Sequence, residues 1–135
     1  MRAVKISQSD EFVRELPDKY DHIVQAGGKN FSGGQRQRLT IARALVGDPQ
    51  ILILDDSASA LDFATDAKLR KAIRTHLSEA TTFIVTQRTN SIKDASKIIV
   101  INNGEIVDIG THEDLLERCS VYQEIHYSQN KKETK

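Results

Sequence analysis

Hydrophobic positions divide the chain into short segments separated by turns that contain glycine or proline. Residues 51–54 form an unbroken aliphatic run, which is typical of a strand covered on both faces, and residues 82–86 form a second β-rich run. Between the two runs, five positions recur at helical spacing: Leu61, Thr65, Leu69, Ile73 and Leu77. A strand, a helix and a strand in this order predict a crossover connection and a parallel sheet with strands near residues 51–55 and 82–86.

The N-terminal part of the chain predicts two helices around a loop. Residues 9–16 predict a short helix that ends before Pro17. Residues 17–34 are rich in glycine, aspartate and asparagine and predict a loop, after which the next helix begins where the glycines stop. Aliphatic positions continue that helix until residues 47–49, whose Gly-Asp-Pro sequence ends it.

The C-terminal part predicts a hairpin followed by a helix. Residues 98–101 and 105–109 are β-rich and flank Asn102-Asn103-Gly104, a turn sequence that tolerates positive φ. Residues 111–114 read Thr-His-Glu-Asp, which resembles a capping box, so we expect a final helix from there past Tyr122. Residues 128–135 are polar and predict a frayed tail.

Composition indicates an ordinary globular protein. The chain of 135 residues has 39% hydrophobic and 28% charged residues, with 19 basic and 19 acidic side chains interleaved, so we expect no nucleic-acid partner. We expect neither a transmembrane segment nor a secretion signal, because no apolar run approaches the required length. Cys119 has no partner for a disulfide, and the four histidines show no shared metal-binding spacing.

A Ser-Gly-Gly-Gln sequence at the start of a predicted helix is the first candidate site, formed by Ser32, Gly33, Gly34 and Gln35. Paired glycines bring backbone N–H groups close to a ligand, and the helix N-terminus adds partial positive charge, so this turn suits a phosphate oxygen. Ser32 adds a hydroxyl donor. Taken alone, the same sequence is more often a turn with an N-cap, and both readings stay open at this point.

A pair of carboxylates, Asp55 and Asp56, ends the first predicted strand. The carboxyl ends of parallel strands are where ligand sites lie in α/β proteins. Asp55 can hold Mg²⁺ through water, because this ion prefers oxygen ligands and keeps much of its hydration. The alternative is that the two aspartates only terminate the strand.

The order of these segments and two that follow, Ser59-Ala60-Leu61-Asp62 and Gln87-Arg88, resembles the ATP-binding-cassette (ABC) transporter ATPase domain. The resemblance implies the signature at residues 32–35, the Walker B strand ending at Asp55, the D-loop at residues 59–62 and the switch region at Gln87. The implied fold is α/β: a partial P-loop NTPase core with parallel strands and a crossover helix, part of a helical subdomain, and a C-terminal β-hairpin and helix. Residues 1–47 would form the helical subdomain with the signature helix, residues 48–127 the core, and residues 128–135 a tail.

Three departures from the family pattern shape the functional hypothesis. The chain has no Gly-x-x-x-x-Gly-Lys-Ser/Thr sequence, so the loop that grips ATP is missing and we expect a fragment that is inactive alone. Asp56 stands where the family has a glutamate that activates water, and Gln87 stands where it has a histidine. Apart from these three, Phe31 is a mild variation: it replaces the usual leucine and should still fill an apolar pocket.

These departures imply the degenerate-site subunit of a heterodimeric exporter that binds ATP and Mg²⁺. Its partners would be a second nucleotide-binding domain and the transporter's transmembrane domain, on the cytoplasmic side of the membrane. One alternative is a truncated, non-hydrolytic module that docks on an intact ABC subunit. Another is a soluble ABC ATPase of DNA repair or translation, which the exporter-like C-terminal residues disfavour. A strand missing beside residues 82–86 would leave an open apolar sheet edge, so we expect the isolated chain to associate.

Overall fold

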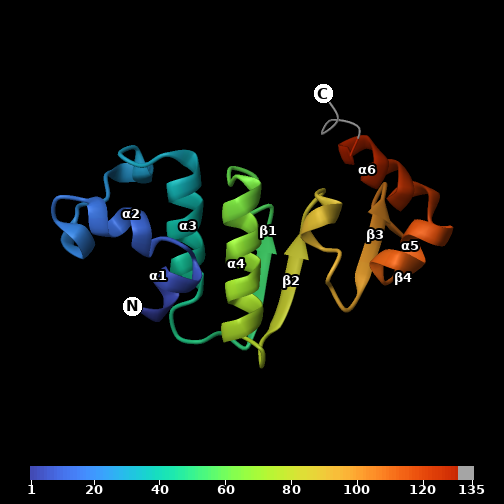
Figure 1. Ribbon diagram of the computed structural model, residues 1–135, viewed down its shortest axis with the longest axis horizontal. Helices are drawn as coiled ribbons and strands as arrows, with labels where there is room; N and C mark the ends of the chain where they lie inside the picture. The colour runs from blue at the N-terminus through green and yellow to red at the C-terminus, as the bar shows by residue number, and fades with distance from the viewer. Residues whose placement is uncertain (131–135) are drawn as a thin grey trace. The chain divides into compact units, whose positions relative to one another are not determined.

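The computed structural model describes residues 1–130 and divides the chain into two compact units, Met1–Val85 and Thr86–Lys135 (Figure 1). Among the described residues, no helix has both the length and the apolar character that crossing a membrane requires. The division at residue 47 implied by the resemblance stays a prediction. Each unit is described by itself below.

The first unit is a pair of parallel strands flanked by helices on one side. Strand β1 pairs with β2 in a register that joins Ile51 to Thr81 and Asp55 to Val85, and α4 makes the crossover between them. The predicted strand, helix and parallel strand are therefore confirmed. The elements of this unit are α1 (Arg2–Ile6), α2 (Asp10–Glu15), two 3₁₀ turns η1 (Lys19–Asp21) and η2 (Ala26–Gly28), α3 (Gly33–Ala44), β1 (Ile51–Asp55), α4 (Phe63–His76) and β2 (Thr81–Val85).

The core of this unit covers only one face of the sheet. Leu52 and Leu54 are buried against aliphatic side chains of α1, α3 and α4, whereas Ile51 and Ile53 are 62% and 65% exposed. The expectation that the run at residues 51–54 is covered on both faces is therefore wrong for the described chain. The reason is geometric: successive side chains of a strand point to opposite faces, and α1, α3 and α4 all pack on the same one.

The helices at the N-terminus differ from the prediction in two places. Helix α1 forms where no helix was predicted, and its buried residue Ile6 joins the core. Helix α3 begins at Gly33 rather than after the glycines, because Ser32 caps it. The predicted short helix before Pro17 is confirmed as α2.

An aromatic cluster attaches α2 to the start of α3. Phe31 is buried and packs edge-on against Phe12, with ring centroids 6.1 Å apart. The guanidinium of Arg38, on α3, lies 4.7 Å from the Phe12 ring centroid and donates a hydrogen bond to the Gln8 carbonyl at 2.8 Å. The prediction that Phe31 fills an apolar pocket is confirmed, and the contacts fix α2 beside α3.

The second unit is an antiparallel hairpin packed on two short helices. Asn103 and Gly104 both have positive φ, as a two-residue hairpin turn of the mirror-image type requires, so the predicted hairpin is confirmed. One extra residue, Val107, bulges from the second strand between the pairs Val100–Asp108 and Ile101–Ile106. The elements of this unit are the 3₁₀ turn η3 (Thr89–Ser91), β3 (Ile98–Asn102), β4 (Glu105–Gly110), α5 (His112–Arg118) and α6 (Ser120–Asn130).

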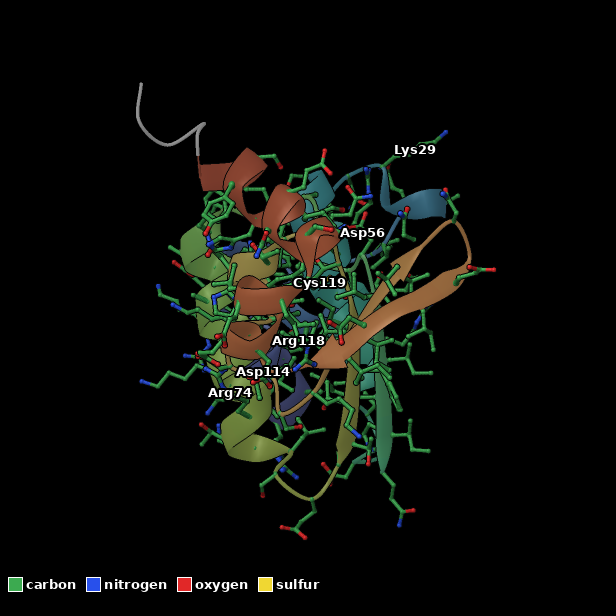
Figure 2. All side chains as sticks on the ribbon, turned by 90° about the vertical axis from the view of Figure 1, so that its right-hand side faces the viewer. Lys29, Asp56, Arg74, Asp114, Arg118 and Cys119 are labelled. Carbon is green, nitrogen blue, oxygen red and sulfur yellow. The ribbon has the colours of Figure 1, made fainter. Side chains whose placement is uncertain are left out.

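The final predicted helix is two helices in the structure. Cys119, buried between α5 and α6 (Figure 2), has φ −100° and ψ 102°, which are not helical, so the chain turns there. The predicted capping box at the start of α5 is confirmed: the Thr111 hydroxyl oxygen accepts the Asp114 N–H at 3.2 Å, and the Asp114 carboxylate accepts the Thr111 N–H at 3.0 Å. Helix α6 includes residues 128–130 of the predicted tail, and residues 131–135 lie outside the described residues.

Candidate functional site

The turn at residues 32–35 lies at the N-terminus of α3 and forms a capping box. The Ser32 hydroxyl oxygen accepts the Gln35 N–H at 3.2 Å, and the Gln35 side-chain oxygen accepts the Ser32 N–H at 2.9 Å. The N-cap reading of this sequence is therefore realised. The phosphate reading stays open as well, because Ser32 is exposed, its hydroxyl keeps a proton to donate, and the first N–H groups of a helix have no intrahelical acceptor.

The two glycines of this turn differ in what lies behind them. A Cβ on Gly34 would lie 3.1 Å from the carbonyl oxygen of Ala60, closer than ordinary van der Waals contact. A Cβ on Gly33 would meet the Ala60 Cβ at 3.6 Å, an ordinary contact. The close approach of α3 to the segment after β1 therefore favours glycine at position 34, because a Cβ there would make Ala60 shift, independently of any ligand.

The two carboxylates lie at the end of β1, as predicted. Asp55 is the last residue of the strand, and Asp56 (labelled in Figure 2) follows it with φ 45°, a left-handed conformation. The Asp56 N–H donates to the Val85 carbonyl at 3.0 Å, which fixes its backbone at the carboxyl edge of the sheet. Both side chains are exposed, so their oxygens are accessible to a ligand.

Each residue of the predicted D-loop, residues 59–62, has a different role in the structure. Ser59 accepts a hydrogen bond from Gln37 at 3.0 Å, Ala60 packs against α3, and Leu61 is buried in the core. Asp62 caps α4: its carboxylate accepts the Thr65 N–H at 2.9 Å and the Thr65 hydroxyl at 2.7 Å. These hydrogen bonds, the one from the backbone first, hold the pKa of Asp62 below its usual range.

Gln37 joins this group, although sequence reasoning did not single it out. Its side-chain oxygen accepts the Ala60 N–H at 2.9 Å, and its side-chain nitrogen donates to the Ser59 hydroxyl at 3.0 Å. The same nitrogen lies 3.5 Å from the Asp56 carbonyl oxygen. The hydrophobic and polar pattern does not reveal these partners of Gln37, because they lie about twenty residues away along the chain. They become neighbours only when the chain folds.

Gln87 belongs to the second unit and follows β2 by two residues. Its carbonyl accepts a hydrogen bond from the side chain of Gln129 on α6, whose oxygen accepts the Thr89 N–H at 3.2 Å. The Thr89 hydroxyl lies 2.9 Å from Nδ1 of His126. Helix α6 thus fixes the backbone after the predicted switch position, while the Gln87 side chain is exposed.

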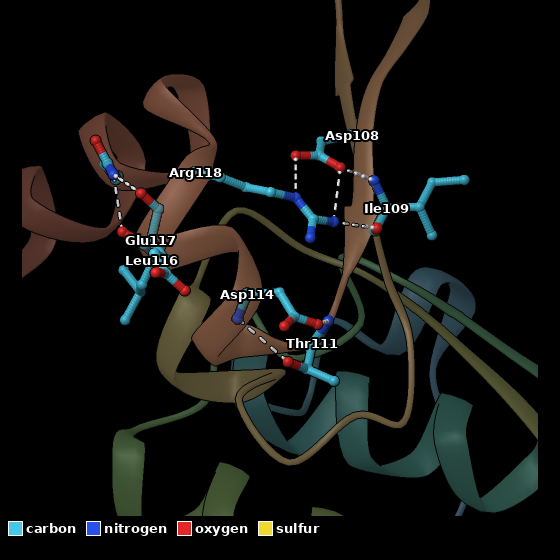
Figure 3. Close-up of polar contacts among 8 residues, drawn as sticks. Asp108, Ile109, Thr111, Asp114, Leu116, Glu117 and Arg118 are labelled. Carbon is cyan, nitrogen blue, oxygen red and sulfur yellow. Dashed lines mark hydrogen bonds and ion pairs between the residues drawn. The ribbon is translucent and has the colours of Figure 1, made fainter.

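A group of polar contacts in the second unit holds the hairpin to α5 (Figure 3). Arg118 binds Asp108 through two nitrogens, each at 3.1 Å, and donates to the Ile109 carbonyl at 2.9 Å. The Arg118 hydrogen bond holds the pKa of Asp108 below its usual range, and hydrogen bonds with Thr111 do the same for Asp114. These contacts fix the hairpin to α5.

Metal binding by protein side chains alone is not supported for residues 1–130, where no group of three metal-binding side chains occurs. His112 and His126 do lie together, with ring centroids 5.3 Å apart, yet no third ligand joins them among the described residues. The exposed carboxylates of Asp55 and Asp56 fit a different arrangement, in which Mg²⁺ takes one or two carboxylates together with water and phosphate oxygens.

Comparison with known proteins identifies the family. A family model described as ABC transporter matches residues 4–59. A putative ABC transporter ATP-binding protein of Mycoplasma genitalium is 48% identical over 127 residues, which are 94% of this chain and 20% of that protein. An ATP-dependent lipid A-core flippase of Desulfotalea psychrophila is 43% identical over 128 residues, which are 95% of this chain and 22% of that protein.

A solved structure gives the same result for the fold. A bacterial Atm1-family ABC exporter with ATP bound superposes with a TM-score of 0.88 at 36% identity, covering 95% of this chain and 22% of that one. The chain thus spans about a fifth of the length of these relatives. We conclude that this chain is part of an ABC transporter ATPase domain and is homologous to the ATP-binding proteins of ABC exporters.

Proposed function

We propose that this chain contributes the signature side of a nucleotide sandwich in an exporter, where it completes an ATP site held by a second nucleotide-binding domain. The observation that carries the proposal is the turn at residues 32–35, which offers the hydroxyl of the exposed Ser32 and helix N-terminal N–H groups at the start of the 12-residue helix α3. Those groups suit a phosphate oxygen presented by another polypeptide. Binding and hydrolysis of ATP between the two domains would drive transport through a transmembrane domain, with this chain on the cytoplasmic side.

The chain's other site residues would serve its own nucleotide site. Asp55 would hold Mg²⁺ through water, and the ion would neutralise charge on the phosphates. Asp56 would accept a proton from the attacking water, and Gln87 would donate a hydrogen bond to a phosphate oxygen. Because the chain has no P-loop sequence of its own, we expect no hydrolysis by the isolated chain.

We expect this second site to hydrolyse ATP slowly. The competent site would then depend on residues of a partner with a different sequence, so the dimer would be a heterodimer. Aspartate is one methylene shorter than the family's glutamate, and a displacement of about 1 Å can cost roughly 10² in rate. Gln87 cannot become cationic as a histidine can. In a full-length heterodimer, whose subunit supplies the P-loop that this chain lacks, Asp56→Glu together with Gln87→His should therefore raise turnover at this site by roughly 10², measured with the partner's catalytic base removed. Unchanged turnover would exclude the degenerate-site role.

The signature role has a separate test with a matched control. Ser32→Ala removes the phosphate donor and also the N-cap of α3, so it lowers stability as well as binding. Thr111→Ala removes the N-cap of α5, far along the chain, and is the control for lost stability. At equal amounts of assembled transporter, Ser32→Ala should lower the partner site's ATP turnover and Thr111→Ala should not. Equal effects of the two variants would overturn the proposal.

The alternative is that this chain is a truncated, non-hydrolytic module. Such a module would bind an intact ABC subunit through residues 32–35 without belonging to a transporter of its own. Sequencing the DNA before the codon of Met1 separates the two roles, because an in-frame P-loop and membrane domain would exclude the module.

A further inference from the structure

Gln37 lies on α3, two residues after the turn at residues 32–35. Its amide reaches across to the segment after β1, where it accepts the Ala60 N–H at 2.9 Å and donates to the Ser59 hydroxyl at 3.0 Å. The orientation of the amide follows from these partners, because only its oxygen can accept a backbone N–H. One half-buried side chain therefore satisfies two groups on a neighbouring segment.

A second contact joins the same two segments. The backbone of α3 approaches so closely at Gly34 that a Cβ there would lie 3.1 Å from the Ala60 carbonyl oxygen. The segment is fixed at its other end by the Asp56 N–H, which donates to the Val85 carbonyl at 3.0 Å. Residues 56–60 are thus held between the sheet edge and the N-terminal turns of α3, so a shift of one moves the other.

We propose that Gln37 is a positioning residue that couples the turn at residues 32–35 to the backbone carrying Asp56. The coupling rests on the function proposed above, in which that turn contacts the partner's nucleotide while Asp56 belongs to the chain's own site. When the turn binds a phosphate, α3 is restrained, and Gln37 passes the restraint to Ser59 and Ala60. Because coupling between two binding sites is reciprocal, nucleotide at either site changes affinity at the other by the same factor.

The structural part of the proposal is tested by amide hydrogen exchange of the full chain. Gln37→Met keeps the side-chain length but removes both hydrogen bonds, so protection of the Ala60 amide should fall roughly two- to tenfold, the contribution of one net hydrogen bond. Gln37→Glu keeps an acceptor for that amide and should retain the protection. The control is Thr40→Ala on the same helix, whose hydroxyl donates to the Arg36 carbonyl at 3.0 Å.

Protection is normalised to the Leu77 amide, which bonds to the Ile73 carbonyl at 2.8 Å and reports on the core of the unit. A fall at Ala60 but not at Leu77 supports the tie between α3 and residues 56–60. Unchanged protection of Ala60 in Gln37→Met would overturn it. Equal losses at both amides would also overturn it, since they would mean that the substitution only destabilises the unit.

The functional part is tested in the assembled transporter, with a fluorescent ATP analogue as the probe. The measured quantity is the factor by which nucleotide bound at the partner's site changes the affinity of this chain's site for the analogue. Gln37→Met should reduce that factor roughly two- to tenfold while Thr40→Ala leaves it unchanged, and an unchanged factor in Gln37→Met overturns the coupling role. If Ser32→Ala leaves the partner's turnover intact, the proposed function fails, and the exchange result at Ala60 still decides the tie.

Discussion

Replacing Gly34 by alanine tests how closely α3 approaches the segment after β1. The new Cβ would lie 3.1 Å from the Ala60 carbonyl oxygen and 3.6 Å from a methyl of Leu61, so the backbone of Ala60 has to move by a few tenths of an ångström. That movement is opposed by the hydrogen bond from the Ala60 N–H to Gln37. Inserting an extra carbon into a packed site costs typically about 1–3 kcal/mol.

The opposing effect is the helix propensity of alanine, which exceeds that of glycine by about 1 kcal/mol at most. We therefore expect Gly34→Ala to lower the free energy of unfolding by about 1 kcal/mol. Gly33→Ala is the matched control, because its Cβ would make only an ordinary contact at 3.6 Å with Ala60. Gly33→Ala should gain the higher helix propensity of alanine without a close contact to Ala60. Its free energy of unfolding should therefore equal that of the parent or exceed it by up to about 1 kcal/mol.

The assay is urea unfolding of the full chain, followed by circular dichroism, for the parent and the two variants. A change in midpoint at constant slope reports a change in stability rather than in the surface exposed. The two variants should differ by about 1–2 kcal/mol if the close approach is real. Equal stabilities, or a Gly34→Ala variant more stable than the parent, would refute the reasoning.

Three further predictions use the same unfolding assay. Leu69→Ala, in the core at 1% exposure, should lower the free energy of unfolding by about 2–5 kcal/mol, and a smaller loss would mean that the core can collapse around the cavity. Thr111→Ala should lower it by about 0.5–2 kcal/mol, whereas Thr111→Ser keeps the capping oxygen and should not. Because Asp62, Asp108 and Asp114 have lowered pKa values, their stabilisation is present above the unfolded pKa of about 3.9 and is lost as the pH falls through the lower folded values. The urea concentration at the unfolding midpoint should therefore decrease when the pH is lowered below about 4. Asp62→Asn keeps the cap but cannot titrate, so this decrease should be smaller in that variant.

Short-range patterns predicted the elements whose cause lies within a few residues. The hairpin turn follows from Asn103 and Gly104, which tolerate the positive φ that the turn needs. The capping box at Thr111 joins residues three apart, and the crossover helix shows its buried stripe directly in the sequence. The positions of Asp55 and Asp56 at a strand end follow from the same reasoning, because an aliphatic run has a visible end.

Features that depend on distant contacts were not predicted. Helix α1 has five residues, too short to be stable by itself, and forms because Ile6 packs in the core. The break at Cys119 interrupts a sequence with no glycine or proline, where α5 and α6 change direction to pack beside the hairpin. The link from Gln37 to Ala60 is of the same kind, since its partners become neighbours only once β1 lies beside α3.

Each sheet has one bare side, because the helices of its unit pack on the other side. In the first unit the uncovered face carries Ile51, Ile53, Phe83 and Val85, and in the second the hairpin exposes four isoleucines opposite its helices, at positions 99, 101, 106 and 109. Apolar surface of this kind lowers the free energy by roughly 25 cal/mol for each Å² that becomes covered, so it favours association with further polypeptide. The relatives have about five times as much sequence, because the chain spans 20% to 22% of their length. We therefore expect these residues to be more stable within a whole transporter than in the isolated chain, whose bare faces should make it associate.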